Sequence, residues 1–111
     1  MVDDWTINVR VETELVKNWV DTKQIDYSTI SGVIYIKGRL NFQLDIFVNP
    51  DDQDYFEKRT MVEVEKVKRI ERNLKKIAGV RAVKFELENW TKMGVRWIRL
   101  KSQASTGQKQ G

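Results

Sequence analysis

The sequence predicts an α+β fold, an αββαβ two-layer sandwich in which two helices cover one face of a small mixed sheet. Three segments indicate this class: a glycine-bounded hairpin at residues 25–40, a long amphipathic helix at 54–78 and an alternating strand at 80–88. No proline-rich or glycine-rich linker divides the 111 residues. We therefore expect one domain over residues 1–101 and a disordered tail over 102–111, where Gln, Ser, Gly and Lys dominate.

The first helix is predicted from Asp3 or Asp4, either of which can cap it, to about Val20. Apolar residues recur at helical spacing along this segment, at Ile7, Val11, Leu15 and Trp19. Residues 5–11 also alternate as a strand would, but the four-residue spacing continues past Val11 and the alternation does not. The longer pattern favours the helix.

The hairpin is predicted from two β-rich segments, Ile25 to Ile30 and Val33 to Leu40, on either side of Ser31-Gly32. In the second segment Ile34 and Ile36 share one face with Leu40, and the other face carries Val33, Tyr35, Lys37 and Arg39. We expect the first face to be core and the second to be a mildly basic surface that bears an aromatic ring.

Residues 41–56 are the least regular part of the chain, with a candidate short strand at Leu44 to Val48 that Pro50 ends. The acidic residues Asp51, Asp52 and Asp54 lack the glycine and the distant glutamate of an EF-hand loop. They are interpreted as a solvated loop and helix cap, and no metal or other cofactor is predicted.

The second helix has the strongest periodicity, with apolar residues spaced by threes and fours from Met61 to Ile77 and Gly79 placed to cap its end. In the strand that follows, Val83, Phe85 and Leu87 alternate with charged residues. Residues 89–94 are predicted to be a loop, and Val95 to Leu100 is a candidate additional strand with apolar residues on both faces.

Three of these segments resemble the BON domain family: Ile7-x-x-x-Val11-x-x-x-Leu15, Ser31-Gly-Val-Ile-Tyr-Ile-Lys-Gly38 and Ile77-Ala-Gly-Val-Arg-Ala-Val-Lys-Phe. The matching places are held by Gly32, Val33, Gly38, Gly79, Val80 and Val83. The chain departs from the family pattern at Ala78, where a proline is usual, and in the length of residues 41–56. The resemblance implies a non-catalytic module that binds phospholipid surfaces or other macromolecules.

The composition argues against common kinds of enzyme, because the chain has no histidine and no cysteine and so lacks the usual neutral-pH acid–base group and the thiolate nucleophile. Its net charge of +4 is uneven: residues 1–56 carry 10 acidic and 5 basic residues, whereas residues 57–111 carry 6 and 15. This asymmetry predicts that a basic surface, if one forms, comes mainly from the second half.

The first functional hypothesis is a module that binds an anionic phospholipid surface or another acidic partner through the sheet and the second helix. Candidate binding residues are Tyr35, Lys37, Arg39, Lys84, Trp90, Arg96 and Arg99. Trp90 is included as an interfacial anchor because it falls in the predicted loop beside Lys92. No catalytic or metal-ligating residue is proposed.

Two alternatives remain open. Docking to a protein partner or homo-oligomerisation is suggested by the apolar Val95 to Leu100 segment, and nucleic-acid binding by the sequence pI near 9.4. The second is weaker, because no KH-type glycine clamp or aromatic RNP-like cluster is present. The acidic N-terminus lacks the features of a signal peptide, so a cytoplasmic location is expected, or a periplasmic one if the chain is truncated.

Overall fold

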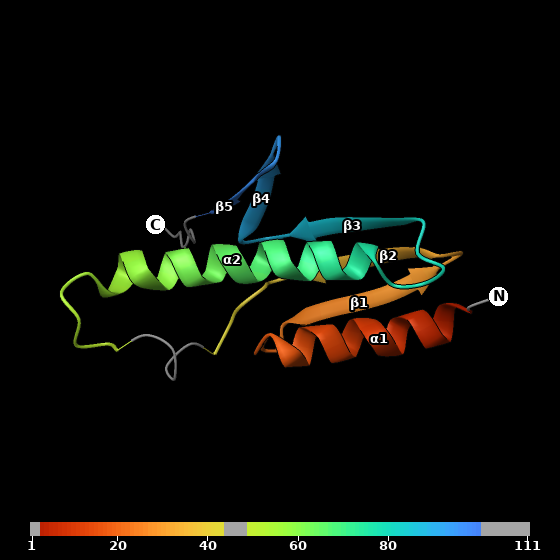
Figure 1. The fold of residues 1–111 in the computed structure, drawn as a ribbon, viewed down its shortest axis with the longest axis horizontal. Helices are drawn as coiled ribbons and strands as arrows, with labels where there is room; N and C mark the ends of the chain where they lie inside the picture. Colours follow the sequence, from red (N-terminus) through yellow and green to blue (C-terminus); the bar gives the residue numbers. More distant parts are fainter. Residues whose placement is uncertain (1–2, 44–48, 101–111) are drawn as a thin grey trace, which may run out of the picture.

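A computed structural model describes residues 3–43 and 49–100. The predicted strand at 44–48 and the predicted tail at 102–111 lie outside the described residues. The elements follow the order α1 (Asp4–Lys17), β1 (Ile25–Ile30), β2 (Val33–Gly38), α2 (Tyr55–Lys75), β3 (Ala82–Leu87), β4 (Trp90–Met93) and β5 (Arg96–Arg99). The α+β class is confirmed, with a two-stranded β4–β5 sheet added to the expected elements (Figure 1).

The main sheet has the strand order β1-β2-β3, with β1 antiparallel and β3 parallel to β2. The register places Ile34 beside Thr29 on one side and Val83 on the other. Because neighbouring residues across a sheet point to the same face, Ile34, Ile36, Val83 and Phe85 form a single apolar face. Both helices pack on this face, and no element of residues 3–43 and 49–100 covers the opposite face of the sheet.

The core is centred where the two helices meet this face. Ile7, Val11 and Leu15 of α1 are fully buried, as predicted from their four-residue spacing. Val67, Ile70 and Leu74 of α2 are buried in the same cluster, together with Ile34 and Ile36 of β2. The middle of each expected stripe therefore packs, whereas Trp19 and Met61, also expected in the stripes, are 44% and 68% exposed.

Helix α1 begins as expected and ends earlier than expected. Asp3 is the N-cap, accepting a hydrogen bond of 2.8 Å from the Thr6 backbone N–H. The helix ends at Lys17 because the next residue, Asn18, is a buried C-cap that donates to the Glu14 carbonyl and carboxylate. Trp19 then adopts φ 63, which no helix continues through.

The β1–β2 turn is the two-residue Ser31-Gly32 turn that was predicted, and both residues have positive φ, 50 and 79. The Asp4 carboxylate accepts hydrogen bonds from the Ser31 and Gly32 backbone N–H groups at 2.8 and 2.9 Å. Asp4 therefore fixes the start of α1 against the turn, while its neighbour Asp3 caps the helix.

Residues 89–94 were predicted to be a loop, and this is wrong. Residues 90–93 form β4, which pairs antiparallel with β5 around a two-residue turn at Gly94 and Val95. Gly94 has φ 64, which suits the first position of such a turn. The additional strand expected at residues 95–100 is present as β5, but it pairs with β4 and not with the main sheet.

Candidate functional site

The β4–β5 hairpin is fixed to the body of the protein by its two tryptophans. Trp90 is 2% exposed and its indole N–H donates to the Leu40 carbonyl at 3.0 Å. Trp97 is 5% exposed and its ring stands edge-on to Phe85, with ring centroids 5.0 Å apart. The base of the hairpin is thus part of the hydrophobic core.

This burial corrects the sequence interpretation of Trp90. It was expected in an exposed loop as an interfacial anchor, but its side chain lies inside the protein and cannot reach a membrane or partner. Residue Asn89, 3% exposed, holds it there by bonding both backbone groups of Leu40, at 2.9 Å each.

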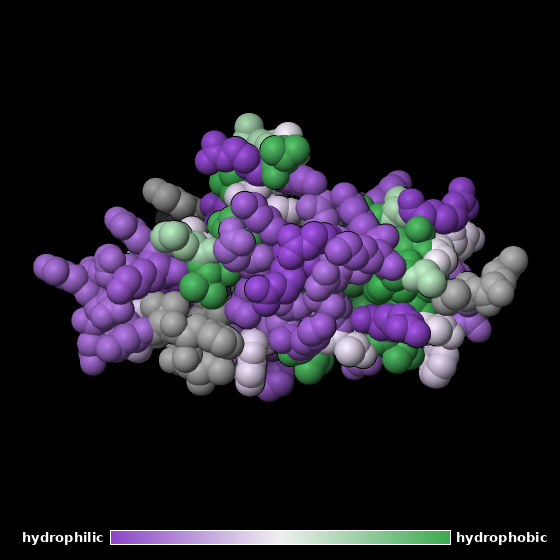
Figure 2. Space-filling view, in the orientation of Figure 1, coloured by the Kyte–Doolittle hydropathy of each residue, from purple (hydrophilic) through white to green (hydrophobic). Residues whose placement is uncertain are grey.

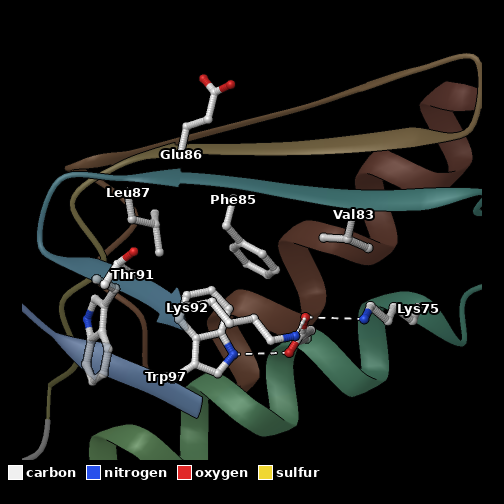
Figure 3. A pocket seen from close by; sticks show the side chains of 10 residues that line it. Lys75, Val83, Phe85, Glu86, Leu87, Thr91, Lys92 and Trp97 are labelled. Atoms are coloured by element: carbon white, nitrogen blue, oxygen red, sulfur yellow. Dashed lines mark hydrogen bonds and ion pairs between the residues drawn. The ribbon is translucent and has the colours of Figure 1, made fainter. Parts of the chain in front are cut away.

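The side chains of Lys75, Lys92 and Trp97 (labelled in Figure 3) converge on one carboxylate of α2, that of Glu71. It accepts hydrogen bonds from the Lys92 ammonium at 2.6 Å and the Trp97 indole N–H at 3.0 Å, and it pairs with Lys75 at 3.2 Å. Burial raises the pKa of Glu71, but these three donors outweigh burial and leave its pKa below the ordinary value. Glu71 is therefore ionised at neutral pH and acts as an anchor for the hairpin.

A second carboxylate, Glu63, binds the last residue of β5, at the base of the hairpin, to α2. It is 2% exposed and accepts a 2.7 Å hydrogen bond from the Arg99 guanidinium, while Arg59 lies 3.5 Å from its other oxygen. A buried carboxylate needs such partners. Arg99, a predicted binding residue, is therefore engaged in holding the hairpin to the helix.

A cavity of about 500 Å³ lies between α2, β3 and the hairpin (Figure 3). The side chains of Val83, Phe85 and Leu87 point into it from β3, and Glu86 points to the other side of the strand. Its polar groups are mainly those of the Glu71 cluster, which are already paired. The described residues contain no group of three or more metal-ligating side chains that could hold a metal ion.

The far end of the hairpin is exposed and apolar. Met93 is 65% exposed and Val95 is 86% exposed, and both stand at the tip that projects beyond β3 (Figure 1). Lys92 and Arg96 flank them, one on each strand. In Figure 2 the projecting part at the top of the molecule carries hydrophobic and hydrophilic side chains together.

The predicted sheet surface is present but is not purely basic. The structure brings Tyr35, Lys37 and Lys84 together on the open face, with the Lys84 ammonium 6.0 Å from the centre of the Tyr35 ring. Lys37 faces Glu86 at 3.7 Å, and Arg39 faces Glu88 at 3.8 Å. The basic and acidic charges alternate across this face, so they partly cancel.

Arg96 and Arg99 do not extend that surface, contrary to expectation, because they belong to the separate β4–β5 sheet. Other cations without an ion pair among the described residues, Arg69, Arg72 and Lys76, form an exposed stripe along the last turns of α2 and its C-cap. Their spacing of three and four residues was visible in the sequence, although they were not named as site residues.

Comparison with protein-family models, with curated proteins and with solved structures gives no match. The resemblance to BON domains therefore stays a prediction. None of the described helices is both long enough and apolar enough to cross a membrane.

Proposed function

We propose that the protein is a non-enzymatic module that binds anionic phospholipid surfaces through the tip of the β4–β5 hairpin. The observation that carries this proposal is an exposed apolar pair, Met93 and Val95, at the end of a projecting hairpin and between two basic residues. Adjacent exposed apolar side chains rimmed by polar residues are typical of interaction sites. A membrane interface offers an apolar layer beneath a charged one, which is the order of groups along this hairpin.

Each part of the tip makes a modest contribution. Burying an apolar side chain is worth roughly 25 cal/mol per Å² removed from water, and a basic residue near an anionic membrane about 1 kcal/mol. Arg96 can attract an anionic membrane in this way, whereas the charge of Lys92 is partly neutralised by Glu71. The basic stripe at Arg69, Arg72 and Lys76 adds long-range attraction to the same class of surface. Such a sum fits weak and reversible binding.

The environment of Glu71 supports a binding role over an acid–base role. An acid–base catalyst needs a pKa near the working pH, but the three donors to Glu71 lower its pKa. The order of α1 to β3 is also that implied by the resemblance to BON domains, a family whose implied role is non-catalytic binding.

Co-sedimentation with vesicles tests the proposal directly. A variant that carries both Met93→Ser and Val95→Ser should bind phosphatidylserine-containing vesicles several-fold more weakly than the wild type, and Arg96→Glu should do the same. Met61→Ser is the matched control, because Met61 is 68% exposed but lies on α2. All variants should keep the wild-type circular dichroism, because the changed side chains are exposed.

Three results would contradict the proposal. Equal binding to phosphatidylcholine vesicles would exclude a role for the charges. Unchanged binding by the tip variants would remove the hairpin from the site. Loss of binding in the Arg69→Glu, Arg72→Glu double variant, while the tip variants still bind, would move the site to the α2 stripe.

A further inference from the structure

Within residues 3–43 and 49–100, strand β3 is an outer strand of the main sheet with an open edge, because the order β1-β2-β3 leaves one of its sides without a neighbouring strand. Natural edge strands usually discourage further pairing by being very short, by carrying a proline, a bulge or charged side chains such as lysine, or by being covered. Ala82–Leu87 has six residues, no proline and no residue with positive φ, and its two charged residues, Lys84 and Glu86, point to the open face and have opposite signs, so they oppose pairing only where like charges meet. This edge is therefore able to accept another strand.

The core-facing side chains of β3 are also incompletely covered. On β2 the corresponding residues Ile34 and Ile36 are 0% and 1% exposed. On β3, Val83, Phe85 and Leu87 are only partly buried and face the cavity beside the edge. The apolar layer thus continues to the edge and remains open there.

We propose that β3 pairs antiparallel with β3 of a second copy of the chain, joining the two three-stranded sheets into one. This inference does not depend on the proposed lipid binding. A two-fold axis through such a seam makes each contact occur twice. The pairing must also keep core-facing residues opposite core-facing residues, because a slip of one residue would place apolar side chains on the open face.

Charge selects one register among those that remain. With Phe85 opposite Phe85 of the second copy, Lys84 lies opposite Glu86 of the second copy, and Glu86 opposite its Lys84. A shift by two residues in one direction places Lys84 opposite Lys84 and leaves Glu86 opposite Ala82. A shift in the other direction places Glu86 opposite Glu86 beside two Lys84–Glu88 contacts, so only the register centred on Phe85 has opposite-charge contacts and no like-charge contact. Like charges directly opposite each other destabilise a strand pair and opposite charges stabilise it. The register centred on Phe85 is thus favoured on both counts.

The same register extends a charge pattern already present within one chain. Asp26, Lys37 and Glu86 lie side by side across β1, β2 and β3 on the open face. Across the seam the next residue is Lys84 of the second copy, so the signs alternate along the whole row. The Lys37–Glu86 pair is exposed and 3.7 Å long, which leaves Glu86 free to share a second cation.

The position of the hairpin sets the length of the seam. β4 starts at Trp90, directly after β3, and the hairpin rises past the open edge at that end (Figure 1). The register centred on Phe85 uses residues 82–88 and stops before the hairpin. A seam of this length is short, so we expect reversible association that depends on protein concentration.

Sedimentation equilibrium of the full chain tests the proposal. The wild type should pass from monomer to dimer as its concentration rises. Lys84→Glu or Glu86→Lys alone should raise the dissociation constant about tenfold or more, because each creates two like-charge contacts. The variant with both changes should recover the wild-type affinity, since it restores both pairs with their signs exchanged.

Mixing the two single variants gives the most specific readout. The Lys84→Glu chain and the Glu86→Lys chain should form a heterodimer more readily than either self-associates, and a general loss of stability cannot produce this result. Arg10→Glu is the control of equal charge change, because Arg10 is exposed on α1. Amide exchange in Ala82–Leu87 should slow as the wild-type concentration rises.

A monomer at every concentration would overturn the proposal. So would a dimer that the single reversals leave unchanged, or a mixture of the two variants that does not associate, because either result places the contact away from β3.

Discussion

Replacing Glu71 with alanine should loosen the hairpin and destabilise the protein by about 2 kcal/mol. The Glu71 side chain is 15% exposed and meets Lys92 and Trp97 at 2.6 and 3.0 Å. Each of these two bonds contributes about 1 kcal/mol net. The 3.2 Å pair with Lys75, 54% exposed, adds little because solvent screens it.

The change should appear in urea unfolding followed by circular dichroism. In thermal unfolding, the same loss of about 2 kcal/mol should lower the melting temperature of a domain of this size by roughly 8 °C. Glu65→Ala is the matched control, because Glu65 lies on the same helix and pairs with Lys68 at 3.5 Å with both groups largely exposed. The control should lose less than about 0.5 kcal/mol.

The reasoning is refuted if Glu71→Ala unfolds at the wild-type urea concentration, or if Glu65→Ala loses as much stability. Either outcome would mean that the hydrogen bonds of Glu71 do not hold the hairpin to α2. Glu71→Gln, which keeps one acceptor oxygen, should fall between the wild type and the alanine variant.

Three further predictions concern single residues that stabilise the hairpin and the β1–β2 turn. Because the folded pKa of Glu71 is lowered from 4.5, its stabilisation is present above the unfolded pKa and lost as pH falls through the folded pKa, so the wild-type advantage over Glu71→Gln in urea unfolding should shrink at acid pH. Asn89→Ala should cost about 1–3 kcal/mol, measured by thermal unfolding, because it leaves the buried Leu40 backbone N–H without this partner, whereas the Leu40 carbonyl keeps the Trp90 indole N–H. Gly32→Ala should cost about 1–3 kcal/mol in the same assay, because φ is 79 and a Cβ atom there would lie 2.8 Å from the Gly79 carbonyl oxygen.

Much of the fold could be predicted from local pattern. The α2 periodicity and the β3 alternation each extend over enough residues to exclude the other kind of element. The Ser31-Gly32 turn followed from its position between two β-rich segments. The hairpin at residues 90–99 was only half predicted, because β4 has four residues and a mixed polar character. The sequence feature that could have indicated this hairpin is the position of two large aromatic residues, Trp90 and Trp97, on either side of Gly94.

The candidate site was predicted only in part: Arg96 was named, but Met93 and Val95 were not, because residues 89–94 were expected to be a loop. The charged contacts around it could not be predicted from local pattern, because packing brings distant residues together. Lys37 and Glu86 are neighbours only because β3 lies parallel to β2 in one register. Arg99 meets Glu63 only because β5 packs on α2. Burial of Trp90 likewise depends on Leu40, 50 residues earlier in the chain. Such contacts join distant residues, so local sequence holds little information about them.

The four tryptophans give this protein two separate optical reporters. Trp90 and Trp97 are buried at the base of the hairpin, whereas Trp5 and Trp19 are 75% and 44% exposed at the two ends of the α1 region. A soluble quencher such as iodide should therefore remove mainly the emission from the α1 region and leave that of the hairpin. Any event that detaches the hairpin from α2 should make the second pair accessible, so local opening can be distinguished from global unfolding without attaching a label.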